Sequence, residues 1–143
     1  MSAVVKTVMM EHLTVYSALS LRDFCARFRA VLHLPEIHFD AENETEWGLT
    51  ELNDIEYNVS RPYAAATLRE WDDTVPSGCN FGIALCLLRS HQQPTHEWAF
   101  EHLVTPVARC LANEFSTTVH YHRTWLGPGQ NIPRNAQFQP TAA

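Results

Sequence analysis

The hydrophobic pattern of this 143-residue chain changes its period at Pro35, and this change limits the possible folds more than any other feature. Ser20 lies three residues before Asp23, which is the spacing of a capping-box-like helix start. Proline pushes the residue before it out of the helical region, so a helix ends before Pro35. The apolar residues between these points have the spacing of one helical stripe: Leu21, Phe24, Cys25, Phe28, Val31 and Leu32. The pattern predicts an amphipathic helix.

After Pro35 the apolar residues recur with the period of a strand. Ile37 and Phe39 predict a short strand or an extended entry, and residues 40–46 predict an acidic loop. Apolar and polar residues then alternate over 47–59 around Asn53 and Asp54, a pair typical of turns. This segment predicts a β-hairpin with one face in the core and one acidic face.

The remaining segments supply three more strands and a second helix. Residues 3–16 and 118–125 predict the first and last strands, and residues 81–88 are apolar on both faces, which is typical of a central strand. Small residues in that strand would allow a helix to approach closely: Gly82, Ala84 and Cys86. Residues 62–79 form a long connection with two possible helical turns over 64–71.

The second helix is expected to begin at Thr95, a good N-cap residue, and to kink or restart at Pro106. Its apolar stripe is Phe100, Leu103, Val104, Val107, Leu111 and Phe115. The order of elements predicts an α+β fold, in which two amphipathic helices pack on a mainly antiparallel sheet of about five strands. We expect a single domain over residues 1–126 and an extended C-terminal tail over 127–143, docked through Ile132 or Phe138.

Composition excludes several classes of protein. No apolar run approaches the roughly 20 residues that a membrane span requires, and residues 1–10 lack the features of a signal peptide. The four cysteines form no CxxC pair, so we expect reduced thiols and a cytoplasmic location: Cys25, Cys79, Cys86 and Cys110.

Acidic residues are concentrated in one part of the chain. The formal net charge is −6, and residues 36–73 contain eleven acids but only two bases. Such a segment repels a nucleic-acid backbone and attracts a basic protein. Two interpretations stay open, a solubilising surface and a docking face. Trp71 lies beside acids in the long connection, so it is either a protein–protein anchor or a packing residue of the loop.

Candidate catalytic and metal-binding residues are few. His120 and His122 share a face of the last strand, but zinc requires three or four ligands. The sequence does not show whether His12, His38, His96 or His102 supplies a third. Cys79 follows a Ser-Gly pair, where a reactive thiol would need a nearby histidine and a lowered pKa. We therefore predict no cofactor, no metal and no catalytic residue.

Five stretches of the chain resemble a family of small bacterial proteins. They are residues 44–48 (ETEWG), 58–63 (NVSRPY), 70–76 (EWDDTVP), 78–82 (GCNFG) and 122–129 (HRTWLGPG). Together they resemble immunity proteins of contact-dependent or type VI polymorphic toxin systems. The resemblance implies a single acidic cytosolic domain that binds a cognate toxin domain, often a basic nuclease, and blocks its active site or substrate path. Binding residues vary in such families, so no position transfers by motif.

Charge and exposure then select the expected binding residues: Glu42, Glu44, Glu46, Glu56, Trp71, Asp72 and Asp73. The expected partner is a basic toxin protein, with no role for nucleic acid or a membrane. Two alternatives stay open. One is a small cytosolic enzyme that uses Cys79 or a His120/His122 site, and the other is an interaction module that self-associates through a sheet edge.

Overall fold

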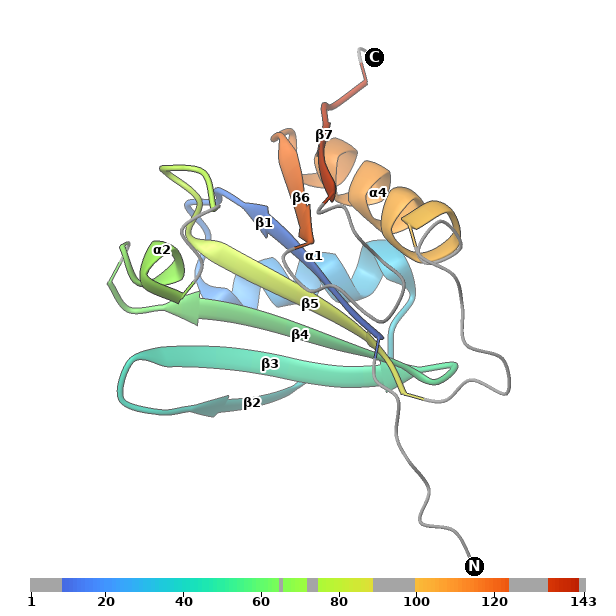
Figure 1. Ribbon diagram of the computed structural model, residues 1–143. Helices are drawn as coiled ribbons and strands as arrows, with labels where there is room; N and C mark the ends of the chain where they lie inside the picture. Colours follow the sequence, from blue (N-terminus) through green and yellow to red (C-terminus); the bar gives the residue numbers. More distant parts are fainter. Residues whose placement is uncertain (1–8, 65, 72–74, 89–99, 124–133, 142–143) are drawn as a thin grey trace, which may run out of the picture.

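An antiparallel sheet with two main helices on one face makes up the computed structural model (Figure 1). The structure describes residues 9–64, 66–71, 75–88, 100–123 and 134–141. In these residues the sheet has seven strands in the order β2-β3-β4-β5-β1-β6-β7, and every neighbouring pair is antiparallel. The predicted α+β class is confirmed, although the sheet has more strands than the five or so expected.

The strands agree with the predicted segments, including the short strand expected at Ile37 and Phe39, and add one, β7, at an edge. Their bounds are β1 Met9–Val15, β2 His38–Ala41, β3 Thr45–Leu52, β4 Ile55–Pro62, β5 Phe81–Leu87, β6 Val119–Arg123 and β7 Arg134–Phe138. The β3–β4 hairpin turns at Asn53 and Asp54, whose φ angles of 54° and 65° are those of a type I′ turn. Strand β5 lies between β4 and β1, so its central position is confirmed.

Strand β7 comes from the segment that the sequence predicted as a tail. It pairs with β6, with Val119 opposite Phe138. The Phe138 ring lies 6.2 Å from the ring of Phe100, between centroids, so Phe138 docks this segment on the core. The other expected contact, Ile132, lies outside the described residues.

Helix α1 (Leu21–Leu32) begins as its sequence predicts. The Ser20 hydroxyl oxygen accepts a hydrogen bond of 3.1 Å from the backbone N–H of Asp23. The helix ends at His33, which is left-handed with a φ of 55° and donates its backbone N–H to the Ala30 carbonyl. The residue before Pro35 therefore lies outside the helix, as proline geometry requires.

The second predicted helix restarts at its proline. A π-helical turn, η1 (Phe100–Val104), leads into helix α4 (Thr105–Phe115), and Pro106 occupies the first turn of α4. A proline is tolerated there because the first N–H groups of a helix have no partner within it. The expected cap at Thr95 lies outside the described residues. A short helix, α2 (Thr67–Trp71), forms in the long connection as predicted.

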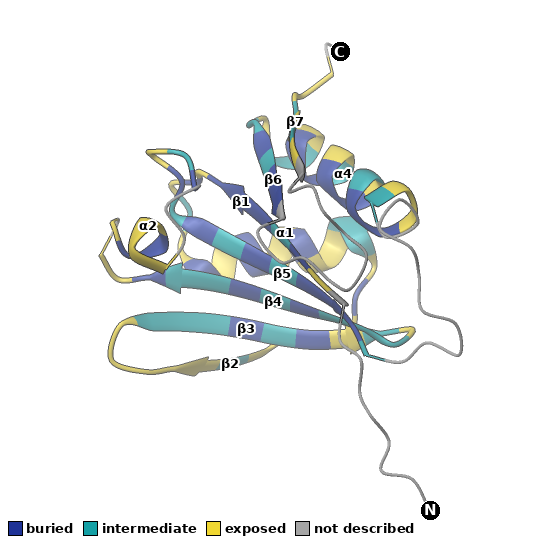
Figure 2. Cartoon of the chain, in the orientation of Figure 1, coloured by how far each residue is buried: buried dark blue, intermediate teal, exposed yellow. Residues whose placement is uncertain are grey.

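The core lies between the sheet and the layer of α1 and α4 (Figure 2). The ring of Phe24 on α1 stacks between those of Phe81 on β5 and Phe115 on α4, with centroids 4.2 Å away in each case. Along β5, the residues that alternate with Phe81 point to the opposite face of the sheet, where α2 packs. A Cβ placed on Gly82 would lie 3.3 Å from Cδ2 of Leu68 on α2, so the predicted close approach of a helix to this strand is confirmed. No helix in the described residues is long and apolar enough to cross a membrane.

Candidate functional site

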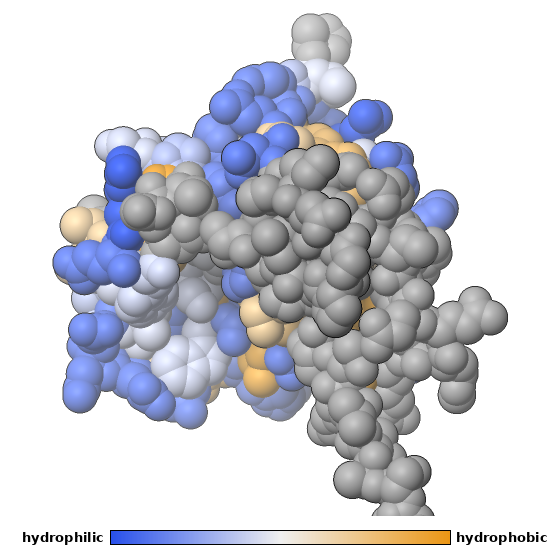
Figure 3. Space-filling view, in the orientation of Figure 1, coloured by the Kyte–Doolittle hydropathy of each residue, from blue (hydrophilic) through white to orange (hydrophobic). Residues whose placement is uncertain are grey.

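One end of the sheet gathers acidic and aromatic side chains. Strands β3 and β5 begin at this end, and β1 and β4 finish there. The β2–β3 turn and α2 lie at the same end (Figure 1). We call this surface the acidic end and define it by six residues: Glu42, Glu44, Glu46, Tyr63, Glu70 and Trp71. Figure 3 shows hydrophilic residues gathered over this part of the molecule.

The two aromatic side chains of the acidic end are exposed to solvent. Tyr63 is 57% exposed and Trp71 is 50% exposed, whereas most aromatic side chains in the described residues are partly or fully buried. The backbone N–H of Tyr63 donates a 3.0 Å hydrogen bond to the carbonyl of Glu44, so this tyrosine is fixed beside the acidic turn. Exposed aromatic side chains of this kind are favoured anchors in protein–protein interfaces.

The carboxylates of the acidic end differ in how far their charge is balanced. Glu46 forms a 3.3 Å ion pair with Nη1 of Arg61, across the β3–β4 pair. Glu42 and Glu44 are exposed and form no ion pair with another described residue. The tip of the β2–β3 turn therefore presents two carboxylates to solvent that form no ion pair within the described part of the chain.

The structure brings only part of the predicted binding set together. Glu42, Glu44, Glu46 and Trp71 lie at the acidic end, but Glu56 lies near the other end of the β3–β4 hairpin, opposite Glu51. Arg61, which pairs with Glu46, is five residues along β4 from Glu56, and five strand residues span about 16 Å. Asp72 and Asp73 lie outside the described residues.

The two histidines of the last strand share a face, as their spacing predicts. The rings of His120 and His122 are nearly parallel, with centroids 6.4 Å apart. Nε2 of His122 lies 3.1 Å from Oγ1 of the buried Thr14, at hydrogen-bond distance, and burial lowers the pKa of His120. The third candidate His12 lies opposite His122 on β1. Within the described part of the chain, no three histidine, cysteine or acidic residues are arranged to hold a metal ion.

The environment of Cys79 does not favour a nucleophile. Its side chain is buried beside Leu68 and Val75, and burial raises the pKa of its thiol. Burial also raises the pKa of Cys25 to about 12 and that of Cys86 to about 11. A catalytic cysteine needs the opposite shift, because the thiolate is the reactive form. All four cysteines are free thiols, including Cys110.

One buried carboxylate, that of Glu11, was not predicted from the sequence. Glu11 is fully buried on the face of β1 that packs under the helices, and Oε1 of Glu11 accepts a 3.0 Å hydrogen bond from the Tyr121 hydroxyl. The signal was present in the alternation of β1, where Glu11 is in phase with Leu13 and Val15. A charged residue in the apolar phase of a strand points to a buried polar pair, because an unpaired buried carboxylate is costly.

Comparison of the chain with protein-family models, with curated proteins and with solved structures gives no match. No role therefore transfers to a residue of this chain from a relative. The charges, exposure and geometry described above are the basis for assigning a function.

Proposed function

We propose that this protein is an immunity-type inhibitor, which binds a cognate bacterial toxin domain in the cytoplasm through the acidic end and neutralises it. The observation that carries the proposal is that one end of the sheet holds two exposed aromatic side chains, Tyr63 and Trp71, together with the exposed carboxylates of Glu42 and Glu44, which form no ion pair with another described residue. The four free cysteines support a reducing compartment, which is what the cytoplasm provides.

The two kinds of side chain would contribute differently to binding. The carboxylates would accelerate encounter with a basic groove, such as that of a nuclease, since charge complementarity acts mainly on the association rate. The aromatic side chains would lower the dissociation rate by filling apolar hollows on the partner. Each carboxylate that becomes buried needs an arginine or lysine of the toxin, because an unpaired buried charge is destabilising.

The geometry narrows the expected binding set. Glu42, Glu44, Glu46 and Trp71 form its centre, and Asp72 and Asp73 stay in the proposal because they follow Trp71 directly in the chain. Glu56 belongs to the interface only for a partner that extends along the whole β3–β4 hairpin, about 16 Å from the acidic end. A compact partner would leave Glu56 in solvent.

The test first identifies the partner, by searching the neighbouring genes for a toxin domain or by pull-down from the source cell, and then measures a pair of matched double variants against that partner. E42K/E44K reverses two charges at the acidic end, and E51K/E101K reverses two exposed carboxylates elsewhere, so both variants change the net charge equally. We expect E42K/E44K to slow association at least tenfold at low ionic strength and to abolish protection of a bacterial host that expresses the toxin. E51K/E101K should protect as the unmodified protein does.

Three outcomes would contradict the proposal. Full protection by E42K/E44K would reject the acidic end as the docking surface. An equal loss in both double variants would mean that net charge alone matters, and that no particular surface is used. The absence of any toxin gene beside this one, together with no binding to basic toxin domains, would reject the immunity role itself.

A further inference from the structure

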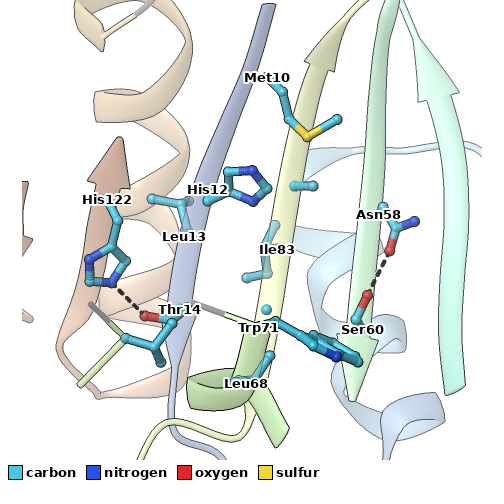
Figure 4. Close-up of a pocket in the computed structure, with 13 residues that line it drawn as sticks. Met10, His12, Leu13, Thr14, Asn58, Ser60, Leu68, Trp71, Ile83 and His122 are labelled. Carbon is cyan, nitrogen blue, oxygen red and sulfur yellow. Dashed lines mark hydrogen bonds between the residues drawn. The ribbon is translucent and has the colours of Figure 1, made fainter. Parts of the chain in front are cut away.

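A pocket lies on the face of the sheet opposite α1 and α4, next to the acidic end (Figure 4). Its volume is about 320 Å³. Strand β5 forms the floor through Gly82 and Ala84, and α2 closes one end through Leu68 and Trp71. Figure 4 shows the Trp71 side chain reaching from α2 toward Ser60 on β4, while His12 projects from β1 on the other side.

The floor is hollow because two successive residues on this face of β5 are small. Gly82 has no side chain and Ala84 has one methyl group. The larger side chains on the neighbouring strands β1 and β4 therefore form the walls of the pocket. Leu68 rests directly on Gly82, where a Cβ would meet Cδ2 of the leucine at 3.3 Å. The pocket is therefore bounded by packed elements on the sheet side and by an aromatic ring at one end.

The described lining residues are apolar or polar, and two of them are histidines, His12 and His122. None of the described lining residues is an aspartate, glutamate, arginine or lysine, although acidic residues are abundant a short distance away. The Ser60 hydroxyl donates a 3.0 Å hydrogen bond to Oδ1 of Asn58, which fixes both side chains in the wall. The hydroxyl oxygen and the amide N–H₂ group retain further capacity to accept and donate hydrogen bonds.

We propose that this pocket binds an uncharged, planar heteroaromatic molecule of about the size of indole or a nucleobase. A volume of about 320 Å³ equals roughly ten water volumes, which corresponds to a molecule of about ten heavy atoms. A strongly charged ligand is disfavoured because no aspartate, glutamate, arginine or lysine among the described lining residues would offset its loss of water. A flat ring can stack on the Trp71 indole while its polar edge bonds with Ser60 and Asn58.

The pocket shares Trp71 with the proposed toxin-binding surface, but its floor and walls are separate from Glu42 and Glu44, so binding of a small molecule does not depend on the toxin-inhibitor role. The probes are indole and adenine, added separately to the full chain and followed through the amide NMR signals of Gly82 and Ala84. We expect one of them to bind at a single site with a Kd on the order of 0.1–1 mM, the range for a ligand of about ten heavy atoms. Binding of adenine alone would identify the polar edge as the feature recognised, and binding of indole would identify the stacked ring.

Three variants make the test specific. A84L fills the floor and W71A removes the stacking ring, and each should weaken binding at least tenfold. Q137L places the same leucine side chain on the same sheet face outside the pocket, and its Kd should stay within twofold of the unmodified value. Because Trp71 is exposed, W71A keeps the fold intact even if A84L does not. The proposal is overturned if neither probe binds at concentrations up to ten times the expected Kd, or if binding survives W71A.

Discussion

Replacing Gly48 with alanine tests how the strand that leads from the acidic end is attached to the core. Gly48 lies on β3 and faces α1 and the segment before β2. A Cβ at this position would lie 2.7 Å from Cγ2 of Ile37, 3.1 Å from Cε1 of Phe39 and 3.2 Å from Sγ of Cys25. The first distance is shorter than any normal carbon–carbon contact, so Ile37 or the strand must move.

The magnitude follows from two opposing effects. Alanine is preferred to glycine inside a strand by about 0.5–1 kcal/mol, which would stabilise the variant if space were available. Overpacking a closed core costs about 1–3 kcal/mol, and here it acts on a buried isoleucine. We expect G48A to lower the free energy of unfolding by about 1–2 kcal/mol. An unfolding entropy of about 2.1 cal/mol/K per residue converts this to a fall in Tm of about 3–7 °C.

The assay is urea denaturation combined with calorimetry in three backgrounds. In I37A the crowding methyl group is gone, so adding G48A should cost less than half of what it costs in the unmodified protein. In I37V the Cγ2 methyl group remains, so the cost of G48A should be unchanged. This pair separates the steric contact from a general weakening of the core, because both background variants remove buried carbon.

Two results would refute the reasoning. One is a G48A variant that is as stable as the unmodified protein, or more stable, because the strand preference of alanine would then prevail over the contact. The other is an equal cost of G48A in I37A and I37V. For comparison, G82A meets only the flexible end of Leu68 at 3.3 Å and should change the stability by less than about 1 kcal/mol.

Three further predictions concern titratable groups that are buried or partly buried. Y121F removes the hydroxyl that donates to Glu11 and should lower the free energy of unfolding by about 1–3 kcal/mol in urea titrations, so an unchanged midpoint would contradict the pair. Burial lowers the pKa of His120, so the unfolded chain binds its proton more readily and stability falls as the pH drops through about 6.5. H120Q should flatten this dependence between pH 7 and pH 5, and an identical slope in H120Q would contradict it. With a thiol reagent at pH 8, Cys110 should react before Cys25, whose pKa is about 12, and the reverse order in mass spectrometry would contradict the burial of Cys25.

Local signals in the sequence were sufficient for the elements themselves. Helix α1 follows from its apolar stripe and its Ser20 cap, and the β3–β4 hairpin follows from alternation around Asn53 and Asp54. The restart of the second helix follows from Pro106. These features depend on residues that are close together in the chain, so the sequence alone predicts them. Strand β7 was missed because its few residues gain their structure from pairing with β6.

The candidate site was only partly predictable, because it depends on pairing between distant strands. Sequence position grouped Glu56 with Glu42 and Glu46, but antiparallel pairing places Glu56 near the opposite end of the same hairpin. The pocket requires β1, β4 and β5 to lie side by side, and no residue pattern within any one of these strands predicts that arrangement.

The amino-acid sequence by itself determined most of the secondary structure, the α+β class and the acidic character of the segment 36–73, because these depend on local spacing and on composition. Only the tertiary structure decided that β1 lies between β5 and β6, that Glu11 is buried against Tyr121, and which carboxylates lie at the same end of the sheet as Trp71. The physical reason is that strand order and register are fixed by which apolar faces pack together across the whole chain, and a change of a few residues along a strand moves a side chain from one end of the sheet to the other.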